Sequence, residues 1–267
     1  MEEQIWKNIA AVREKSPLVH NITNFVVMNN TANALLAAGA SPVMAHAVDE
    51  VEDMVKIANA LVINIGTLSQ TWVDAMQMAM KQAQKMQKPI VFDPVGVGAT
   101  PYRNQMVVHL ISQAAPTIIR GNASEIMAMV SSEHKTKGVD SLMETENAYE
   151  AAKYLNQQYG SIVCISGKED IIVGNEKRAK VFNGHHLMAH ITGMGCTATA
   201  LIGAFAAVEK DPFQATLNAM SYMGVAGEYA GKNAKGPGSF QVNFLDQLNM
   251  LEEEDFIQKV KVEVADV

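Results

Sequence analysis

The sequence predicts an α/β fold in which helices cover both faces of a mainly parallel sheet. Apolar runs of strand length alternate with helix-length patterns along most of the chain, as in successive βαβ units. The runs are continuously apolar rather than alternating, which is typical of strands covered on both faces. A hairpin pattern near residue 175 interrupts this order before two last helical patterns. The sheet is therefore expected to be mainly rather than wholly parallel.

The individual elements follow from the local hydrophobic pattern and from the glycine residues that end helices and form turns. Apolar runs predict strands at 41–44, 60–66, 89–93, 117–120 and 161–167. Helical patterns predict helices at 3–14, 29–38, 49–58, 72–86, 148–159, 197–208 and 212–229. Gly39 is expected to stop the second helix, and Gly174 with Asn175 to form a hairpin turn between strands at 170–173 and 178–182. We interpret Met76, Met80 and Met86 as residues that fill the core.

Composition limits the class of protein. The chain has 267 residues, 48% hydrophobic and 18% charged, enough to bury a large core. No linker-like segment or change of composition divides it, so a single domain over 1–267 is predicted. The net charge of -7 comes without a basic patch, which argues against nucleic-acid binding. Two cysteines and an acidic N-terminus without an apolar signal or membrane segment predict a cytoplasmic protein.

Polar and glycine-rich sequence follows four of the expected strands. These strand ends are Asp93-Pro94-Val95-Gly96-Val97-Gly98, Arg120-Gly121-Asn122-Ala123-Ser124-Glu125, Ser166-Gly167-Lys168-Glu169-Asp170 and the loop at Gly193. In an open parallel sheet, ligands bind in the crevice beyond the carboxyl ends of the strands. One crevice formed by all four is therefore expected.

The loop Gly193-Met194-Gly195-Cys196 precedes a helix of small residues. Free N–H groups and partial positive charge gather at a helix N-terminus, so the loop is suited to the charge on a transferring phosphoryl group. The same field favours a thiolate at Cys196, which would either accept a hydroxyl proton or line the pocket. The alternative is a glycine-rich cap followed by a buried cysteine.

The same loop mimics a dinucleotide fingerprint, because Gly193, Gly195 and Ala198 fit G-x-G-x-x-A. That fingerprint needs a second strand ending in an acidic residue. The segment 198–208 instead has a helical pattern, and Asp211 with Pro212 begins another helix. A dinucleotide site is therefore disfavoured, and no Walker A pattern is present.

The segment Asn122-Ala123-Ser124-Glu125 has two interpretations. Asn122 followed three residues later by Glu125 is a capping box at a helix start. Glu125 and Asp93 also form an acidic pair at neighbouring strand ends, and magnesium binds to one or two carboxylates plus substrate phosphates. One residue can serve both roles.

The histidines His185, His186 and His190 have no partners at ligand spacing and are interpreted as turn and surface residues.

Six sequence blocks together resemble the hydroxyethylthiazole kinase family. In chain order they are Val19-His20-Asn21-Ile22-Thr23-Asn24, Gly39-Ala40-Ser41-Pro42-Val43-Met44-Ala45, Asp93-Pro94-Val95-Gly96-Val97-Gly98-Ala99, Ile119-Arg120-Gly121-Asn122-Ala123-Ser124-Glu125, Thr192-Gly193-Met194-Gly195-Cys196 and Gly236-Pro237-Gly238-Ser239-Phe240. The resemblance implies a three-layer ribokinase-like α/β fold without a separate lid domain. It also implies a homotrimer with active sites at subunit boundaries.

The same resemblance implies phosphorylation of the hydroxyl of 4-methyl-5-(2-hydroxyethyl)thiazole by ATP and magnesium in thiamine salvage. By position, Met44, Gly193 and Asn24 would contact the thiazole. Arg120, Ser166 and Asn122 would contact ATP, and Asp93 and Glu125 would lie near the metal. Cys196 stands where most ribokinase-like kinases have an aspartate base, and a cysteine there is this family's pattern. Gly193, Gly195 and Cys196 are thus the expected catalytic residues.

Two alternatives remain open on the sequence. One is a kinase of the same fold for another vitamin-precursor alcohol, hydroxymethylpyrimidine or pyridoxine. The other is a protein on that fold that binds the thiazole without catalysis. The acidic pair and the glycine loop favour an enzyme.

Overall fold

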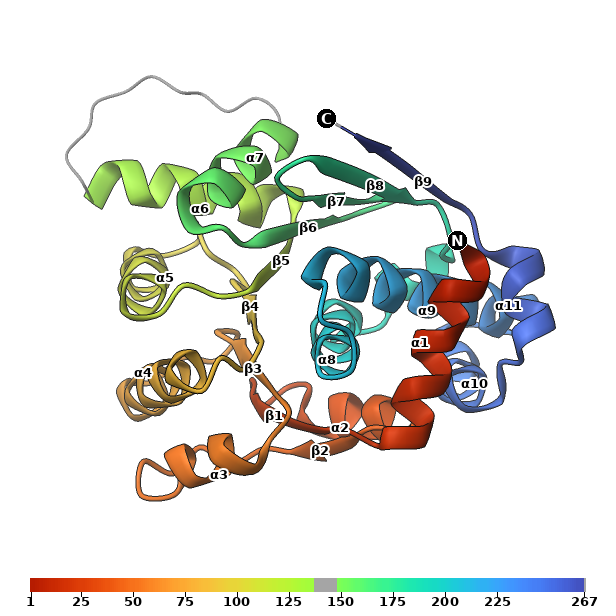
Figure 1. Ribbon diagram of the computed structural model, residues 1–267, viewed down its shortest axis with the longest axis horizontal. Helices are drawn as coiled ribbons and strands as arrows, with labels where there is room; N and C mark the ends of the chain where they lie inside the picture. Colours follow the sequence, from red (N-terminus) through yellow and green to blue (C-terminus); the bar gives the residue numbers. More distant parts are fainter. Residues whose placement is uncertain (137–147, 267) are drawn as a thin grey trace.

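A single nine-stranded sheet runs through the part of the chain that the computed structural model describes, residues 1–136 and 148–266 (Figure 1). Its strand order is β2-β1-β3-β4-β5-β6-β7-β8-β9. Neighbours from β2 to β6 are parallel, and the remaining pairs are antiparallel. The strands are β1 Leu18–Ile22, β2 Ser41–Val43, β3 Ala60–Asn64, β4 Ile90–Asp93, β5 Ile118–Asn122, β6 Ile162–Ser166, β7 Asp170–Val173, β8 Lys177–Val181 and β9 Val262–Asp266.

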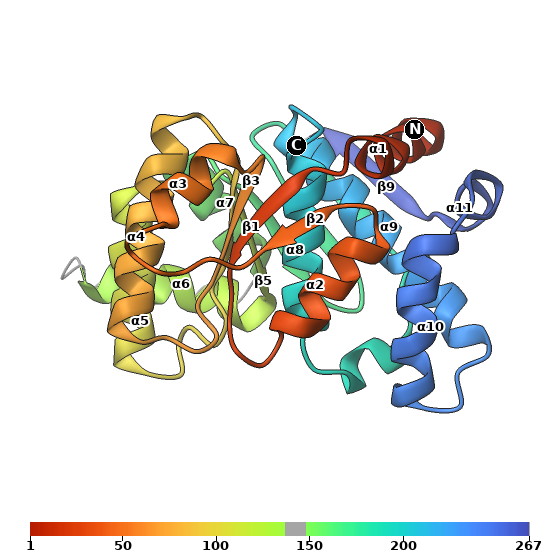
Figure 2. The same ribbon diagram turned by 90° about the horizontal axis from the view of Figure 1, so that it is seen from below.

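Helices cover both faces of this sheet, which gives three layers (Figures 1 and 2). One face carries α3 Val51–Ile57, α4 Gln70–Lys85, α5 Pro101–Gln113, α6 Ala123–Thr136 and α7 Ala148–Tyr159. The other carries α1 Glu2–Lys15, α2 Met28–Ala37, α8 Met194–Ala206, α9 Pro212–Lys232, α10 Pro237–Met250 and α11 Glu253–Lys259. A short 3₁₀ helix, η1 His186–His190, precedes α8. No helix among the described residues is long and apolar enough to cross a membrane.

The central strands are buried on both faces, which explains their continuous apolar runs. In β3, Leu61 and Ile63 belong to the core beneath α3 and α4, whereas Val62 belongs to the core beneath α8. Helix α8 lies very close to the sheet because its residues are small: a Cβ at Gly203 would lie 2.7 Å from Val62 Cγ2. This close packing places the first turn of α8 beside the strand ends.

Most predicted elements are confirmed, including the hairpin of β7 and β8 and the helix α7. The expected strand end before Gly193 is wrong, since that glycine follows η1 rather than a strand. Core filling is confirmed for Met76 and Met80, but Met86 lies at the end of α4 and is 39% exposed. Seven elements of the described residues lie outside the predicted ranges, namely β1, α5, α6, η1, α10, α11 and β9, although the capping box at Asn122 indicates the start of α6.

The missed strand β1 matters most, because it leads directly to Asn24. Its polar residues His20 and Asn21 break the apolar run, yet both are fully buried. A hydrogen bond between His20 Nε2 and the Ala45 carbonyl, 2.7 Å long, makes burial of the imidazole tolerable. Ala45 is distant from His20 in sequence, so the local sequence around His20 does not indicate a buried strand.

Candidate active site

The carboxyl ends of the parallel strands and the first turn of α8 bring a group of polar side chains together. Asn64 and Asp93 are register partners at the ends of β3 and β4, and Asn122 and Ser166 are partners at the ends of β5 and β6. The contacts that follow link Asn24, Asn64, Asp93, Arg120, Ser166 and Cys196. These contacts bring the ends of β3, β4, β5 and β6, the segment after β1 and the start of α8 to one place.

Asp93 is the most deeply buried charged residue of this group, with none of its surface exposed. Its Oδ2 accepts hydrogen bonds from Asn64 Nδ2 at 3.0 Å and Thr199 Oγ1 at 2.7 Å, and Arg120 Nη1 lies 3.8 Å away. Burial raises the pKa of Asp93 to about 6, although the charge of Arg120 and these hydrogen bonds oppose the shift. The other oxygen, Oδ1, is buried without a hydrogen-bond partner.

Arg120 joins Asp93 to the neighbouring strand and to α8. Its Nη2 donates a hydrogen bond to Ser166 Oγ. A Cβ at Gly195 would lie 2.5 Å from Arg120 Nη1, so only glycine allows the guanidinium to lie against the first turn of α8. The predicted ATP-contacting residues Arg120 and Ser166 are thus adjacent, and Arg120 lies against the predicted glycine loop.

Gly193 is the N-cap of α8 and adopts a φ of 83°, in the left-handed region. A side chain there would also collide with Val27, whose Cγ1 would lie 2.6 Å from an added Cβ. The Gly193 carbonyl accepts the first helical hydrogen bond from the Thr197 N–H at 2.8 Å. The expected helix start at this loop is therefore confirmed, and its free N–H groups lie beside Arg120.

Cys196 lies in the first turn of α8, where Asn24 Nδ2 donates a 3.5 Å hydrogen bond to its Sγ. The expected preference for a thiolate is not met. Burial, together with the negative charge of Asp93, raises the pKa of Cys196 to about 11. These two effects outweigh the hydrogen bonds from Asn64 and Asn24 and the charge of Arg120, which lower the pKa, so the resting thiol is protonated.

Asn122 and Glu125 form both halves of the predicted capping box. Asn122 Oδ1 accepts the Glu125 N–H at 2.9 Å, and Glu125 Oε2 accepts the Asn122 N–H at 2.9 Å. Glu125 Oε1 additionally accepts the Gly96 N–H at 2.9 Å, from the loop that follows β4. These bonds hold the Glu125 carboxylate next to the loop that begins at Asp93.

The acidic pair suits a magnesium ion. Asp93 Oδ1 has no protein partner, and the charge of Glu125 raises the pKa of Asp93, so the two carboxylates repel each other. A divalent cation would relieve that repulsion and use the free lone pairs. Across residues 1–136 and 148–266, no three His, Cys, Asp or Glu side chains converge. Water and phosphate oxygens would have to complete the coordination.

Two functional side chains, Asn64 and Thr199, lie outside the predicted set. Asn64 Oδ1 accepts a hydrogen bond from Asn24 Nδ2 at 2.8 Å, while its own Nδ2 donates to Asp93. Thr199 donates to the same Asp93 oxygen from the next turn of α8. A sequence signal existed for each, since both are polar residues within buried apolar segments.

The predicted substrate residues occupy the β1–β2 side of the site. Asn24 is buried and bonded as described, and Val27 contacts Gly193, whereas Val26 is exposed. Met44 is half-buried directly after β2, which β1 and β3 separate from β4. Asn24 is therefore linked to Asp93 through Asn64, whereas Met44 lies at the edge of the sheet.

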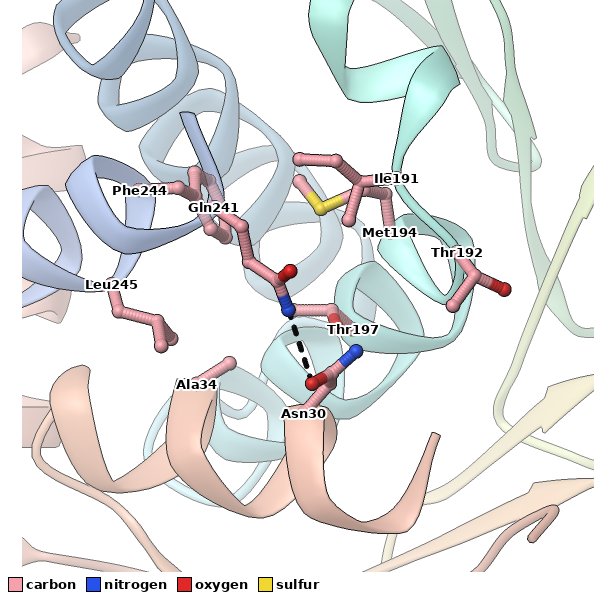
Figure 3. Close-up of a pocket in the computed structure, with 9 residues that line it drawn as sticks. All are labelled: Asn30, Ala34, Ile191, Thr192, Met194, Thr197, Gln241, Phe244 and Leu245. Carbon is pink, nitrogen blue, oxygen red and sulfur yellow. Dashed lines mark hydrogen bonds between the residues drawn. The ribbon is translucent and has the colours of Figure 1, made fainter. Parts of the chain in front are cut away.

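A hollow of about 290 Å³, partly open to solvent, lies between α2, α8 and α10 (Figure 3). Met194 and Thr197 line it from α8, while Gly195, Cys196 and Thr199 lie on the opposite side of that helix by its 3.6-residue period. Asn30 and Gln241 close one side through a 3.1 Å hydrogen bond. None of the predicted site residues lines this hollow.

Comparisons with known proteins agree with this architecture. The model of the Hydroxyethylthiazole kinase family matches residues 9–254. A hydroxyethylthiazole kinase from Syntrophus aciditrophicus (strain SB) is 54% identical over 261 residues, which cover 97% of each chain. The solved structure of a hydroxyethylthiazole kinase protein from Pyrococcus horikoshii OT3 has a TM-score of 0.91 at 41% identity and covers 98% of this chain and 99% of that chain.

A more distant structure shows the fold alone. The pyridoxal kinase from Staphylococcus aureus in complex with pyridoxal is 16% identical, with a TM-score of 0.62 over 94% of this chain and 98% of that chain. The ribokinase-like three-layer fold is thereby confirmed, and residues 1–136 and 148–266 show no separate lid. Given the family model and the relative at 54% identity, the chain belongs to the hydroxyethylthiazole kinase family.

Proposed function

We propose that this protein transfers the γ-phosphoryl group of ATP to the hydroxyl of 4-methyl-5-(2-hydroxyethyl)thiazole, in thiamine salvage. Membership of a kinase family implies the use of ATP and names the acceptor class. The structural observation that carries the proposal is the buried Asp93–Arg120 pair beside the N-terminus of α8. A fixed cation, free N–H groups and carboxylates gathered in one place meet the needs of phosphoryl transfer.

In this mechanism, the first turn of α8 and Arg120 stabilise the charge that develops on the transferred group. Ser166 holds the guanidinium in place, and Gly195 lets it lie against the helix. Asp93 and Glu125 are the residues that would hold a magnesium ion. When bound, the ion would neutralise phosphate charge.

The acceptor hydroxyl would lie beside Cys196 and Asn24. A thiol with a pKa of about 11 is a weak acid whose thiolate is scarce at neutral pH. Phosphoryl transfer passes through a loose transition state, in which the attacking hydroxyl keeps its proton until bond formation is advanced. Cys196 then serves mainly to orient the hydroxyl, and the hydroxyl proton passes late in the reaction to an oxygen of the transferred phosphoryl group.

The experiment is a substrate panel with ATP and magnesium: the thiazole alcohol, hydroxymethylpyrimidine and pyridoxine. The expected result is the highest kcat/KM for the thiazole alcohol. Preference for either of the other two would refute the acceptor assignment. Thiazole binding without ATP consumption would instead identify a non-catalytic binding protein on the same fold.

We further propose a homotrimer of single-domain subunits with active sites at the subunit boundaries, working in the cytoplasm. Phe25 and Val26 follow Asn24 directly and are 64% and 63% exposed, so an apolar surface adjoins the acceptor side of the site. The free cysteines Cys164 and Cys196 suit a reducing compartment.

A further inference from the structure

Arg103, in the first turn of α5, binds the loops that follow two site strands. Its Nη1 donates hydrogen bonds to the carbonyls of Ile65 at 2.6 Å and Val95 at 2.7 Å, and its Nη2 donates to the Gly66 carbonyl at 2.7 Å. The first two carbonyls belong to different loops, one after β3 and one after β4. A single guanidinium therefore ties these two strand ends together.

The Ile65–Gly66 peptide leads from Arg103 to Asp93. Its carbonyl accepts from Arg103, and its N–H, on the opposite side of a trans peptide, donates to Asn64 Oδ1 at 2.9 Å. Asn64 Nδ2 in turn donates to Asp93 Oδ2. The peptide N–H and Asn24 Nδ2 both donate to Asn64 Oδ1, and together they hold the Asn64 amide with its Nδ2 towards Asp93.

The Val95–Gly96 peptide leads from the same Nη1 to Glu125. Its carbonyl accepts from Arg103, and its N–H donates to Glu125 Oε1 at 2.9 Å. Gly96 has a φ of 71°, and a Cβ on it would lie 3.5 Å from the guanidinium. The turn thus brings its backbone against Arg103 while the N–H faces the carboxylate.

We propose that Arg103 is a positioning residue for the acidic pair. It orients and polarises two peptides whose N–H groups hold Glu125 directly and Asp93 through Asn64. The importance of this positioning for turnover rests on the proposed function, in which Asp93 and Glu125 serve the metal and the phosphates. The hydrogen bonds of Arg103 are independent of the proposed function.

Arg103→Lys is the informative substitution, because lysine keeps the charge but not the planar fork that reaches both loops. The chain offers a matched control in Lys88, whose Nζ also donates to three backbone carbonyls, those of Val55, Lys56 and Ala58. Lys88 lies before β4, at the end opposite Asp93. Lys88→Met therefore removes a comparable cation–carbonyl cluster far from the site.

The first readout is independent of catalysis: amide hydrogen exchange at Gly66 and Gly96, measured by NMR. In Arg103→Lys both amides are expected to exchange about tenfold faster or more, because the peptides lose the bond that orients them. In Lys88→Met they keep wild-type exchange. Unchanged exchange at both glycines in Arg103→Lys would overturn the proposal.

The second readout is kinetic. Arg103→Lys is expected to lose about 10- to 100-fold in kcat or in apparent magnesium affinity, the usual cost of disturbing outer partners of a metal site, while Lys88→Met lowers only the melting temperature. Faster exchange with both a wild-type kcat and a wild-type magnesium dependence would refute the positioning role. If Arg103→Lys does not fold, Arg103→Ala replaces it and is assayed with added guanidinium, with urea as the control. Activity regained only with guanidinium supports the proposal, and no recovery refutes it.

A wild-type protein inactive on the thiazole alcohol would refute the proposed function, while the exchange data would still decide the role of Arg103.

Discussion

Burial sets the charge state of the residues at the centre of the site. Asp93 and Cys196 both have a raised pKa, and burial is the largest cause in each case. The two shifts are linked, since the charge of Asp93 disfavours a second negative charge on Cys196. One ionised carboxylate and one neutral thiol are therefore expected at neutral pH.

Alkylation of Cys196 tests this charge assignment. With a pKa of about 11, about 0.1% of the thiol is ionised at pH 8, against about a quarter of an ordinary cysteine. Iodoacetamide should therefore modify Cys196 at least about 100-fold more slowly than free cysteine at pH 8, and the rate should rise with pH towards 11. Mass spectrometry of the modified peptide measures it, with Cys196→Ser as control. A rate that already levels off near pH 8 would show that the helix field prevails over burial.

The acidic pair is tested by removing charge while keeping shape. Asp93→Asn and Glu125→Gln should each lower kcat/KM by about 10- to 100-fold and raise the magnesium concentration needed for half-maximal rate. Melting temperatures must be compared, since Glu125 also holds two backbone N–H groups. Wild-type rates across all magnesium concentrations in both variants would exclude the proposed metal site.

At the scale of elements, two helix starts contribute to the site, and each helix begins with a different kind of cap. Helix α6 begins with the side-chain capping box of Asn122 and Glu125, whereas α8 begins with Gly193 and has no side-chain cap. The uncapped start leaves N–H groups of α8 available for a ligand. The capped start turns its acidic residue towards the loop after β4.

Asn122→Ala should separate the two roles of the first helix start. Loss of the cap is expected to cost about 1 kcal/mol of unfolding free energy, measured by urea denaturation. The KM for ATP should rise as well if Asn122 contacts the nucleotide. A stability loss with an unchanged KM would restrict Asn122 to capping.

Gly195→Ala tests the close approach of α8 to Arg120. Alanine is the better helix former by about 1 kcal/mol, so the helix alone would favour the variant. Its Cβ would nevertheless lie 2.5 Å from Arg120 Nη1 and displace the guanidinium from Ser166. A marked fall in kcat with little loss of melting temperature is expected. Full activity would show that Arg120 does not need this position.

At the scale of the whole molecule, the exposed residues beside Asn24 bear on assembly. Light scattering is expected to give three times the 28.9 kDa mass of the chain. Phe25→Glu with Val26→Glu should yield a folded monomer of low activity, because the apolar surface would become charged. A monomeric wild-type protein with full activity would refute the trimer.

The sequence by itself determined the layers and the parallel centre of the sheet, and it named most of the candidate site residues. Local patterns carry that information: apolar runs such as 60–66, glycine stops such as Gly39, and the capping box at Asn122. Family blocks added the roles of Met44 and Asn24, which local physics does not assign.

Only the tertiary structure decided which groups meet and in what state. The burial of Asp93, the protonated thiol of Cys196, the strand β1 and the bridge of Arg103 to two loops all depend on residues distant in the chain. The physical reason is that desolvation and long-range hydrogen bonds are properties of the folded environment. A residue's type and spacing specify what it can do, and its buried partners determine which of those possibilities is realised.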